Sequence, residues 1–425
     1  MHPLTANETF RLRFWSRVRE FAVPPTMIES ATARRMAGDW AGACAAAHFD
    51  VDLDLRAVGR AHGREFAARV RADLRQLAPD LLRWHFPRIA PDGLLRPDLT
   101  VSLARYRADK EAIHLVARTP PVWADAGQRI SLALWEPSQS RPHPDRRFRL
   151  DLHRHLWDAP RAGELAERAR EGPSAVEIPG CATHRWMAEA ALLLQADGCA
   201  GSTVAVRLSS RRRLMLDVDT RKITVAPARG RPLLPDAATW LLPDVELLRA
   251  GLIDADRLHP LVAAALCPGH RPAGVARSPG SAEERLVECR GAMHRIGVVN
   301  GVLVPLDHDA DEIRREELLI ALGGTGPPCL QAIDTAHRAP ENLADVRARL
   351  DHGDTAGALA VVERLLGADA LLRSGALRDE LETALRRKVS HGMYRAGIGG
   401  YSPPPSTRDK RRPDSRAHPR HATRI

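Results

Sequence analysis

The spacing of apolar residues changes twice along this chain, and this change constrains the fold more than any other feature. From residue 5 to about 90, ESATARRMAGDWAGACAAA and VGRAHGREFAARVRADLRQL place small or apolar residues three and four apart, which predicts helices. From about residue 99 the period becomes two in LTVSLARY, AIHLVART, RISLALW and RFRLDLH, which predicts a meander of roughly four short strands. Helical spacing returns from Asp311 to about Gly397.

The segments between these regions contain both element types. APRAGELAERAR and HRWMAEAALLLQA have helical spacing, whereas STVAVRL, RLMLDV, RKITVA, RLVECR, HRIGVV and GVLVPL alternate as strands do. We therefore predict an α+β fold with helical N- and C-terminal parts around two antiparallel β-sheets. The predicted divisions are a helical region at 1–97, an α+β region at 98–330, a helical hairpin region at 331–401 and a tail at 402–425.

Composition indicates a soluble globular protein in a reducing compartment. The longest apolar run, LVAAALC, is too short to span a bilayer, and the first residues contain no apolar core of a secretory signal. The six Cys are scattered without the spacing of a disulfide framework. We expect a cytoplasmic protein without a membrane partner.

The last residues carry much of the positive charge. From Ser402 to Ile425 there are seven Lys or Arg and two Asp, which is half of the net charge of +10. The segment is rich in Pro, Ser and Arg and poor in apolar residues, so we expect a disordered basic tail. It either contacts nucleic acid or another polyanion or simply aids solubility. The candidate polyanion-binding residues are Arg408, Lys410, Arg411, Arg412, Arg416 and Arg420.

The acidic stretch VVNGVLVPLDHDADEIRREELLIALGG, residues 298 to 324, resembles a calcium loop at first sight. Counting from Asp307, however, Glu312 stands where an EF-hand needs Gly, and Leu318 stands where it needs a bidentate Glu. A structural interpretation explains the stretch better: a hairpin turn at Asn300-Gly301, a helix with a capping box from Asp309 to Glu312, and a helix end at Gly323. A hard-metal pair of Asp307 and His308 is a weaker alternative.

The segment LDLHRHLWD contains the best candidate for a catalytic metal. On a strand, Asp151, His153 and His155 would point to one face, and two His with one carboxylate are ligands of iron or zinc enzymes. An amphipathic strand with a solvated polar face has the same pattern.

Cys-x-x-His pairs occur twice, at Cys181/His184 and Cys267/His270, with Cys289 and His294 nearby in the sequence. These residue types bind zinc, although structural zinc sites usually combine two such pairs flanked by turns. Free buried cysteines beside unrelated histidines are the alternative interpretation.

Two segments share the pattern G-D-x-A-G-A-x-A, namely GDWAGACAAA and GDTAGALAVV. The pattern resembles the turn and second helix of a helical hairpin, but the copies lie far apart, so we predict two isolated hairpins and no solenoid. Ala-rich composition alone is the alternative explanation.

Familiar catalytic signatures are absent from the sequence: there is no phosphate loop, no HExxH, no nucleophile elbow and no kinase motif set. The leading hypothesis is therefore a non-catalytic interaction or regulatory protein with a protein partner and with no cofactor that the sequence identifies. The alternatives are a metal-dependent enzyme using Asp151, His153 and His155, and association with nucleic acid through the tail.

Several long segments together resemble a family of actinobacterial hypothetical proteins. They are WLLPDVELLRAGLIDADRLHPLVAAAL, VECRGAMHRIGVVNGVLVPLDHD, REELLIALGGTGPPCLQAIDTAHRAPE and RLDHGDTAGALAVVERLLG, and the resemblance covers most of residues 235 to 400. It implies a GC-rich bacterial source, in line with the preference for Arg over Lys. It implies no activity, cofactor or site residue.

Overall fold

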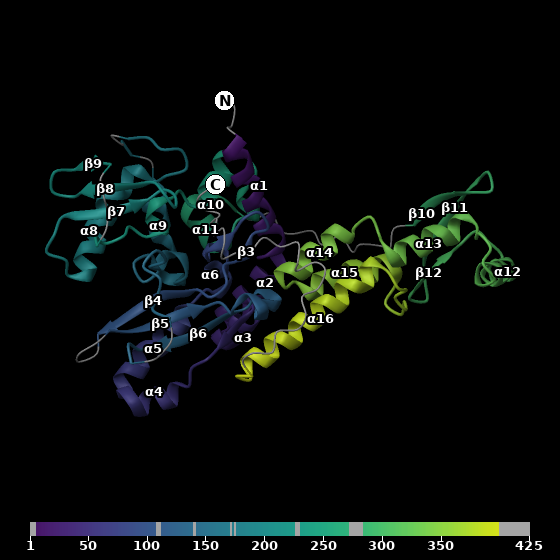
Figure 1. Ribbon diagram of the computed structural model, residues 1–425, viewed down its shortest axis with the longest axis horizontal. Helices are drawn as coiled ribbons and strands as arrows, with labels where there is room; N and C mark the ends of the chain where they lie inside the picture. Colours follow the sequence, from purple (N-terminus) through teal and green to yellow (C-terminus); the bar gives the residue numbers. More distant parts are fainter. Residues whose placement is uncertain are drawn as a thin grey trace. The chain divides into compact units, whose positions relative to one another are not determined.

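The computed structural model describes residues 6–107, 112–138, 142–170, 172–173, 176–225, 230–271 and 284–398 (Figure 1). Helices and several antiparallel sheets are combined, which confirms the α+β class. The described residues form two compact units, divided between residues 273 and 274. The divisions predicted after residues 97, 330 and 401 do not coincide with this boundary. The tail after residue 401, with its six candidate polyanion-binding residues, lies outside the described residues.

The first unit begins with helices, as the sequence predicts. They are α1 (Ala6–Phe21), α2 (Pro25–Met36), α3 (Trp40–Ala46), α4 (Leu55–His62), α5 (Arg64–Gln76) and α6 (Pro79–His85). Helix α5 shows why they form: Phe66, Ala67, Val70 and Leu74 lie on one face at helical spacing, and all four are buried. This face joins the largest apolar core of the unit, which also contains Trp84 and Trp157.

A four-stranded sheet packs on this core, in the order β1-β6-β5-β4. Its strands are β1 (Phe49–Val51), β4 (Thr100–Arg107), β5 (Ala112–Arg118) and β6 (Ile130–Trp135). The predicted meander is confirmed for three strands, but the fourth prediction is wrong. The fourth strand is β1, which pairs in parallel with β6, instead of RFRLDLH.

The segment RFRLDLH contacts β4 only briefly, where Asp151 N also donates to Ser102 O at 2.9 Å, and then turns through local backbone bonds. Arg149 makes one isolated bridge to Ser102, after which Leu152 N donates to Arg149 O and His153 N donates to Leu150 O. The chain then enters the 3₁₀ helix η3 (Arg154–Leu156), followed by η4 (Ala159–Glu164) and α7 (Leu165–Arg168). The indole of Trp157 donates to Leu150 O at 3.0 Å and holds the turn against the core.

A second sheet in the first unit confirms three further strand predictions. It comprises β7 (Thr203–Arg207), β8 (Arg213–Asp217) and β9 (Lys222–Thr224), all antiparallel. Helix α8 (Trp186–Asp197) packs on it around a separate small core that includes Trp186. The remaining elements are β2 (Arg88–Ile89), β3 (Leu94–Leu95), α9 (Asp236–Thr239), α10 (Pro243–Arg249), α11 (Pro260–Leu266), η1 (Val122–Ala124), η2 (Ala126–Gln128), η5 (Thr183–Arg185) and η6 (Ala255–Arg257).

The second unit combines one small sheet with five helices. Its elements are β10 (Arg285–Cys289), β11 (Ala292–Val299), β12 (Val302–Pro305), α12 (Ala310–Ala321), α13 (Pro328–Arg338), α14 (Leu343–His352), α15 (Thr355–Leu366) and α16 (Ala376–Arg395). Both hairpin turns have the positive φ angles of type I′ turns: Asn300-Gly301 at 51° and 75°, as predicted, and Arg290-Gly291 at 56° and 83°. Within this unit, α12 lies at the end of the sheet away from α14 and α15 (Figure 1).

The repeated G-D-x-A-G-A-x-A pattern produces the same helix start twice. Asp39 caps α3 by accepting from Gly42 N at 2.8 Å, and Asp354 caps α15 by accepting from Gly357 N at 2.9 Å. A Cβ at either glycine would overlap the capping carboxylate, so the glycine is needed for the cap. Each copy follows another helix closely, which agrees with two separate helical hairpins.

Among the described residues, none of the helices combines the length and the apolar character needed to cross a membrane.

Candidate metal centre

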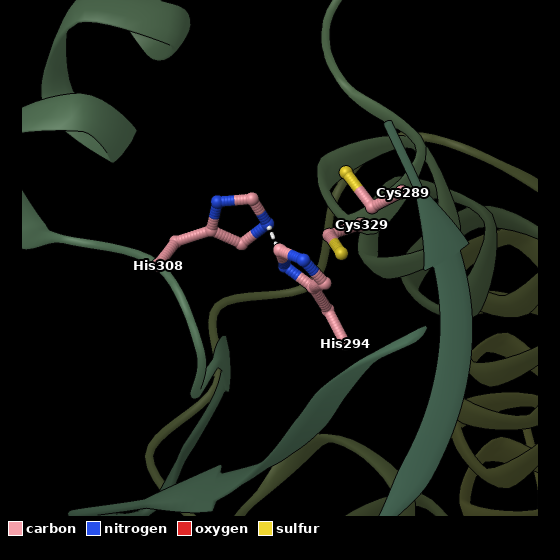
Figure 2. A group of neighbouring side chains, drawn as sticks. All are labelled: Cys289, His294, His308 and Cys329. Atoms are coloured by element: carbon pink, nitrogen blue, oxygen red, sulfur yellow. Dashed lines mark hydrogen bonds between the residues drawn. The ribbon is translucent and has the colours of Figure 1, made fainter. Parts of the chain in front are cut away.

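Four metal-ligating side chains converge in the second unit: Cys289, His294, His308 and Cys329 (Figure 2). One potential ligand atom from each lies within 4.8 Å of those of the other three. Cys289 and Cys329 are fully buried, and the two histidines are partly buried. Among the described residues, these four are the one group of at least three Cys, His, Asp or Glu side chains that lie close enough together to hold one ion.

The first two ligands come from the hairpin of β10 and β11. His294 pairs directly with Val287, and Cys289 lies two residues beyond Val287 on the same strand. Because side chains alternate along a strand, Cys289 and His294 therefore point to the same face. The tight Arg290-Gly291 turn sets this register, so a local feature of the sequence brings the pair together.

His308 lies in the short connection between β12 and α12. Its neighbour Asp307 fixes that connection, since Asp307 accepts from Arg295 N at 2.7 Å and from the Arg295 guanidinium at 2.8 Å. These hydrogen bonds lower the pKa of Asp307 to about 2. Asp307 is thus engaged by Arg295 and lies outside the cluster. Of the predicted hard-metal pair, only His308 contributes a possible ligand.

Cys329 is the second residue of α13, which begins with Pro328. Proline is favoured at this first helical position, and the exposed N–H groups of a helix start favour a negative charge nearby. Burial and the neighbouring Cys289 raise the pKa of the Cys329 thiol to about 11. A bound cation would instead lower the pKa of this thiol, because a thiol that ligates a metal loses its proton.

The two imidazoles face one another, with 2.8 Å between His294 Nδ1 and His308 Nε2 (Figure 2). In a tetrahedral zinc site, bond lengths of about 2.0 Å to nitrogen and 2.3 Å to sulfur separate two nitrogens by roughly 3.3 Å and two sulfurs by roughly 3.8 Å. The two nitrogens need to separate by only about half an ångström to accept an ion. The two nitrogens are therefore close to the spacing of a zinc site, and the four ligand atoms, all within 4.8 Å of one another, would need to contract by at most about 1 Å.

A carboxylate supports the outer side of His308. Glu312 Oε2 lies 3.3 Å from His308 Nδ1, on the ring nitrogen that does not face the cluster. Arg290 holds Glu312 at 2.8 Å and also pairs with Glu316. Carboxylates in this position fix the tautomer and orientation of metal-binding histidines.

Glu312 has a different role from the predicted one. Asp309 is the N-cap residue of α12, as predicted, but its side chain makes no capping bond, and Glu312 contacts His308 and Arg290 instead. The predicted end of the helix is confirmed, with Gly323 at a φ of 90° and Gly324 N donating to Leu319 O.

Two Cys and two His are a ligand set typical of zinc, because thiolates exclude hard cations and the tetrahedral arrangement suits this ion. All four positions are filled by protein side chains. A closed zinc site of this kind holds structure together, whereas catalytic zinc keeps one position for water or substrate.

Asp151, His153 and His155 do not form the strand on which their proposed metal site depended. The Asp151 carboxylate pairs with Arg149 at 2.8 Å. His153 has an acceptor at each ring nitrogen, with Arg149 O at 2.9 Å from Nδ1 and Glu189 Oε2 at 3.2 Å from Nε2. His155 is buried in η3, and its ring centroid lies 5.9 Å from that of His153. The structure therefore gives these residues packing and pairing roles within the first unit.

The two Cys-x-x-His pairs do not come together either. Cys181 is buried against the small core beside α8, and His270 pairs with Asp256 at 2.8 Å. Of the cysteines and histidines considered in the sequence, the structure selects Cys289 and His294. Sequence reasoning did not combine them with His308 and Cys329. The available signal was that the tight Arg290-Gly291 turn places Cys289 and His294 on one face of a two-stranded hairpin.

Comparison with protein-family models, with curated proteins and with solved structures finds no match to this chain.

Proposed function

We propose that this chain is a non-catalytic interaction protein whose second unit is organised by a structural zinc ion. The observation that carries the proposal is the convergence of Cys289, His294, His308 and Cys329 into a closed ligand set. Such a site supplies folding free energy but has no position for substrate. The absence of familiar catalytic motifs from the sequence is consistent with this role.

The zinc ion would connect three parts of the second unit. Its ligands lie on the β10–β11 hairpin, in the connection before α12 and at the start of α13. The apolar core of this unit contains the two cysteine ligands, Cys289 and Cys329, among buried residues of the sheet and of α13 to α16.

Helix α12 is the element that we assign to partner binding. None of its residues is buried, so its attachment depends on its N-terminal end, where Glu312 of the first turn contacts His308 in the preceding connection. Leu318, Leu319 and Ile320 are 61%, 48% and 41% exposed, and Leu322 after the helix is 87% exposed. Apolar residues on an exposed helix are recognised by an apolar groove of a partner protein. Zinc would present this helix in a fixed position.

The cytoplasmic location and the polyanion contact through the tail remain parts of the proposal. All six cysteines are free thiols in the structure, and a zinc–thiolate site persists in a reducing compartment. The first unit provides no support for an enzyme centred on Asp151, His153 and His155.

The partner assignment is tested by tagged purification from the native host. We expect a reproducible protein partner that is lost from Leu318→Glu/Leu322→Glu and from Cys289→Ser/His308→Ala. Leu371→Glu, at another highly exposed leucine of the same unit, is the matched control and retains the partner. A partner captured equally by all variants, or no partner at all, contradicts the assignment, and self-association of the pure protein would identify a second copy as the occupant instead.

A further inference from the structure

The hairpin of β7 and β8 in the first unit concentrates positive charge at its turn. The sequence there is RLSSRRR, residues 207–213, with four arginines in seven positions and no acidic residue. Arg211, Arg212 and Arg213 are exposed, and Arg207 is partly buried. Among the described residues, none of the four forms an ion pair. Their charges are therefore available to a partner.

The hairpin holds these side chains on an ordered support. Ser209 Oγ accepts from Arg211 N at 3.2 Å and from Arg212 N at 2.9 Å, which fixes the turn. Next to the turn, Val206 and Leu214 pair across the strands, and both are buried in the core that α8 shares. Because one face of the hairpin is anchored in this core, the arginines are displayed without a need to order the backbone first.

Arg207 and Arg213 lie directly opposite one another across the two strands. Side chains at such positions are about 5 Å apart and share one face of the sheet, so two like charges there are destabilising. Burial lowers the pKa of Arg207, and the neighbouring Arg147 and Arg213 lower it further. The acids near Arg207 are engaged by Arg147, which pairs with Asp236 at 2.6 Å and donates its backbone N–H to Asp145 at 2.9 Å. A bound anion would relieve the repulsion between Arg207 and Arg213.

The residue types at the hairpin identify the kind of anion. Guanidinium groups form the bidentate hydrogen bonds that phosphate accepts, and a row of them matches the line of phosphates along a nucleic acid. Residues 203–224 contain no aromatic side chain on which the bases of a single strand could stack. A two-stranded ribbon fits the major groove of DNA, whereas the major groove of an RNA duplex is too narrow. These features together favour duplex DNA.

We propose that the turn end of the β7–β8 hairpin binds duplex DNA, with Arg207, Arg211, Arg212 and Arg213 contacting its phosphates. Phosphate contacts carry no base information, so this binding is independent of the DNA sequence. Every residue of the site belongs to the first unit, so the site is separate from the metal centre. It is also separate from the basic residues after position 401.

Fluorescence anisotropy tests the proposal with the full-length protein and a labelled DNA duplex of about 20 base pairs, roughly two helical turns. Arg211→Gln/Arg212→Gln/Arg213→Gln should weaken binding at least about tenfold between about 50 and 200 mM salt. The slope of log K against log salt concentration should fall by about 2 to 3, because each lost phosphate contact removes nearly one unit. Arg211→Glu, a single change in the turn, should shift both quantities in the same direction.

The matched control removes the same charge from another surface of the first unit. Arg60, Arg64 and Arg71 of α4 and α5 are also exposed and also form no ion pair with a described residue. Arg60→Gln/Arg64→Gln/Arg71→Gln should leave the DNA affinity and its salt slope nearly unchanged. Because every substituted position is exposed, both triple variants should keep cooperative thermal unfolding.

Three results would overturn the proposal. The first is an equal loss of DNA affinity in the two triple variants, which would mean that only the overall charge matters. The second is absence of DNA binding by the unsubstituted protein at low salt, or binding of single-stranded DNA or duplex RNA as tightly as duplex DNA. The third is a hairpin variant that keeps its DNA affinity but no longer binds vesicles of phosphatidylcholine and phosphatidylserine, which would make an anionic membrane surface the partner.

Discussion

Glu312 Oε2 lies 3.3 Å from the Nδ1 atom of His308, while the Nε2 atom of the same ring faces His294. One imidazole thus links a carboxylate to the candidate metal centre. Glu312→Gln should lower zinc affinity about 10- to 100-fold, because the amide supports the imidazole less well as a metal ligand. Competition with a chromogenic chelator measures the affinity. Glu317→Gln, on the same helix, is the control, and equal affinities for the two variants would remove Glu312 from the centre.

Removal of the metal should destabilise the second unit selectively. Without zinc the unit loses the connection between the hairpin, α12 and α13, and a chelator is expected to expose amides there to hydrogen exchange. Amides of β4, β5 and β6 in the first unit should keep their protection. Equal loss of protection in both units, or no loss in either, would contradict a zinc ion bound in the second unit.

Gly357→Ala should destabilise the second unit by about 1 kcal/mol, because a Cβ there displaces the Asp354 carboxylate that caps α15. Gly392 lies inside α16 with open space around its Cα, so Gly392→Ala should instead stabilise by about 0.5–1 kcal/mol. Urea unfolding measures both. The cap assignment does not survive if the two substitutions shift stability in the same direction.

His114 should make the first unit sensitive to acid. Burial lowers the pKa of His114 to about 4, and its Nδ1 atom lies 2.8 Å from Ser102 Oγ. An unfolded histidine takes up its proton near pH 6.5, so between about pH 6.5 and 4 the unfolded state binds more protons. Stability from this residue is therefore complete above about pH 6.5 and is lost as the pH falls toward 4.

The measurement is the free energy of unfolding of His114→Gln and of the unsubstituted protein between pH 7.5 and 4.5. The free energy of unfolding of the variant should fall less between pH 7.5 and 4.5 than that of the unsubstituted protein. The difference between the two proteins at pH 7.5 is the reference for this comparison. Parallel curves would mean that His114 titrates at its ordinary pKa.

Deletion of residues 402–425 should weaken binding to heparin or DNA and reduce the salt dependence of that binding. With fewer Lys and Arg contacts to the polyanion, fewer counterions are released on binding. Binding is measured at several salt concentrations. An unchanged slope would leave the tail with a solubilising role only.

The sequence predicted the features that depend on neighbouring residues. The Asn300-Gly301 turn, the helix end at Gly323 and most strands follow from local backbone preferences, and the structure confirms them. Strand β1 was missed because three residues carry little periodic signal, and its parallel partner β6 is distant in the chain. RFRLDLH alternates as a strand does, but ion pairing of Arg149 with Asp151 and packing of Trp157 turn it.

The candidate metal centre was only partly visible in the sequence for the same reason. Cys289 and His294 are joined by one turn, so strand register alone brings them together. Cys329 reaches them through the packing of α13 against the sheet, and His308 through the connection after β12 that Asp307 and Arg295 fix, and no local pattern records either contact. Their spacing along the chain matches no common zinc motif, and tertiary contacts alone define the set.

X-ray absorption at the zinc edge of the purified protein tests the central claim most directly. We predict about one zinc per chain, with two sulfur neighbours near 2.3 Å and two nitrogen neighbours near 2.0 Å. The metal should be lost in Cys329→Ser and retained in Cys199→Ser, at an exposed cysteine of the first unit. Metal-free protein from zinc-supplemented cells, or a zinc ion bound without sulfur, would contradict the account.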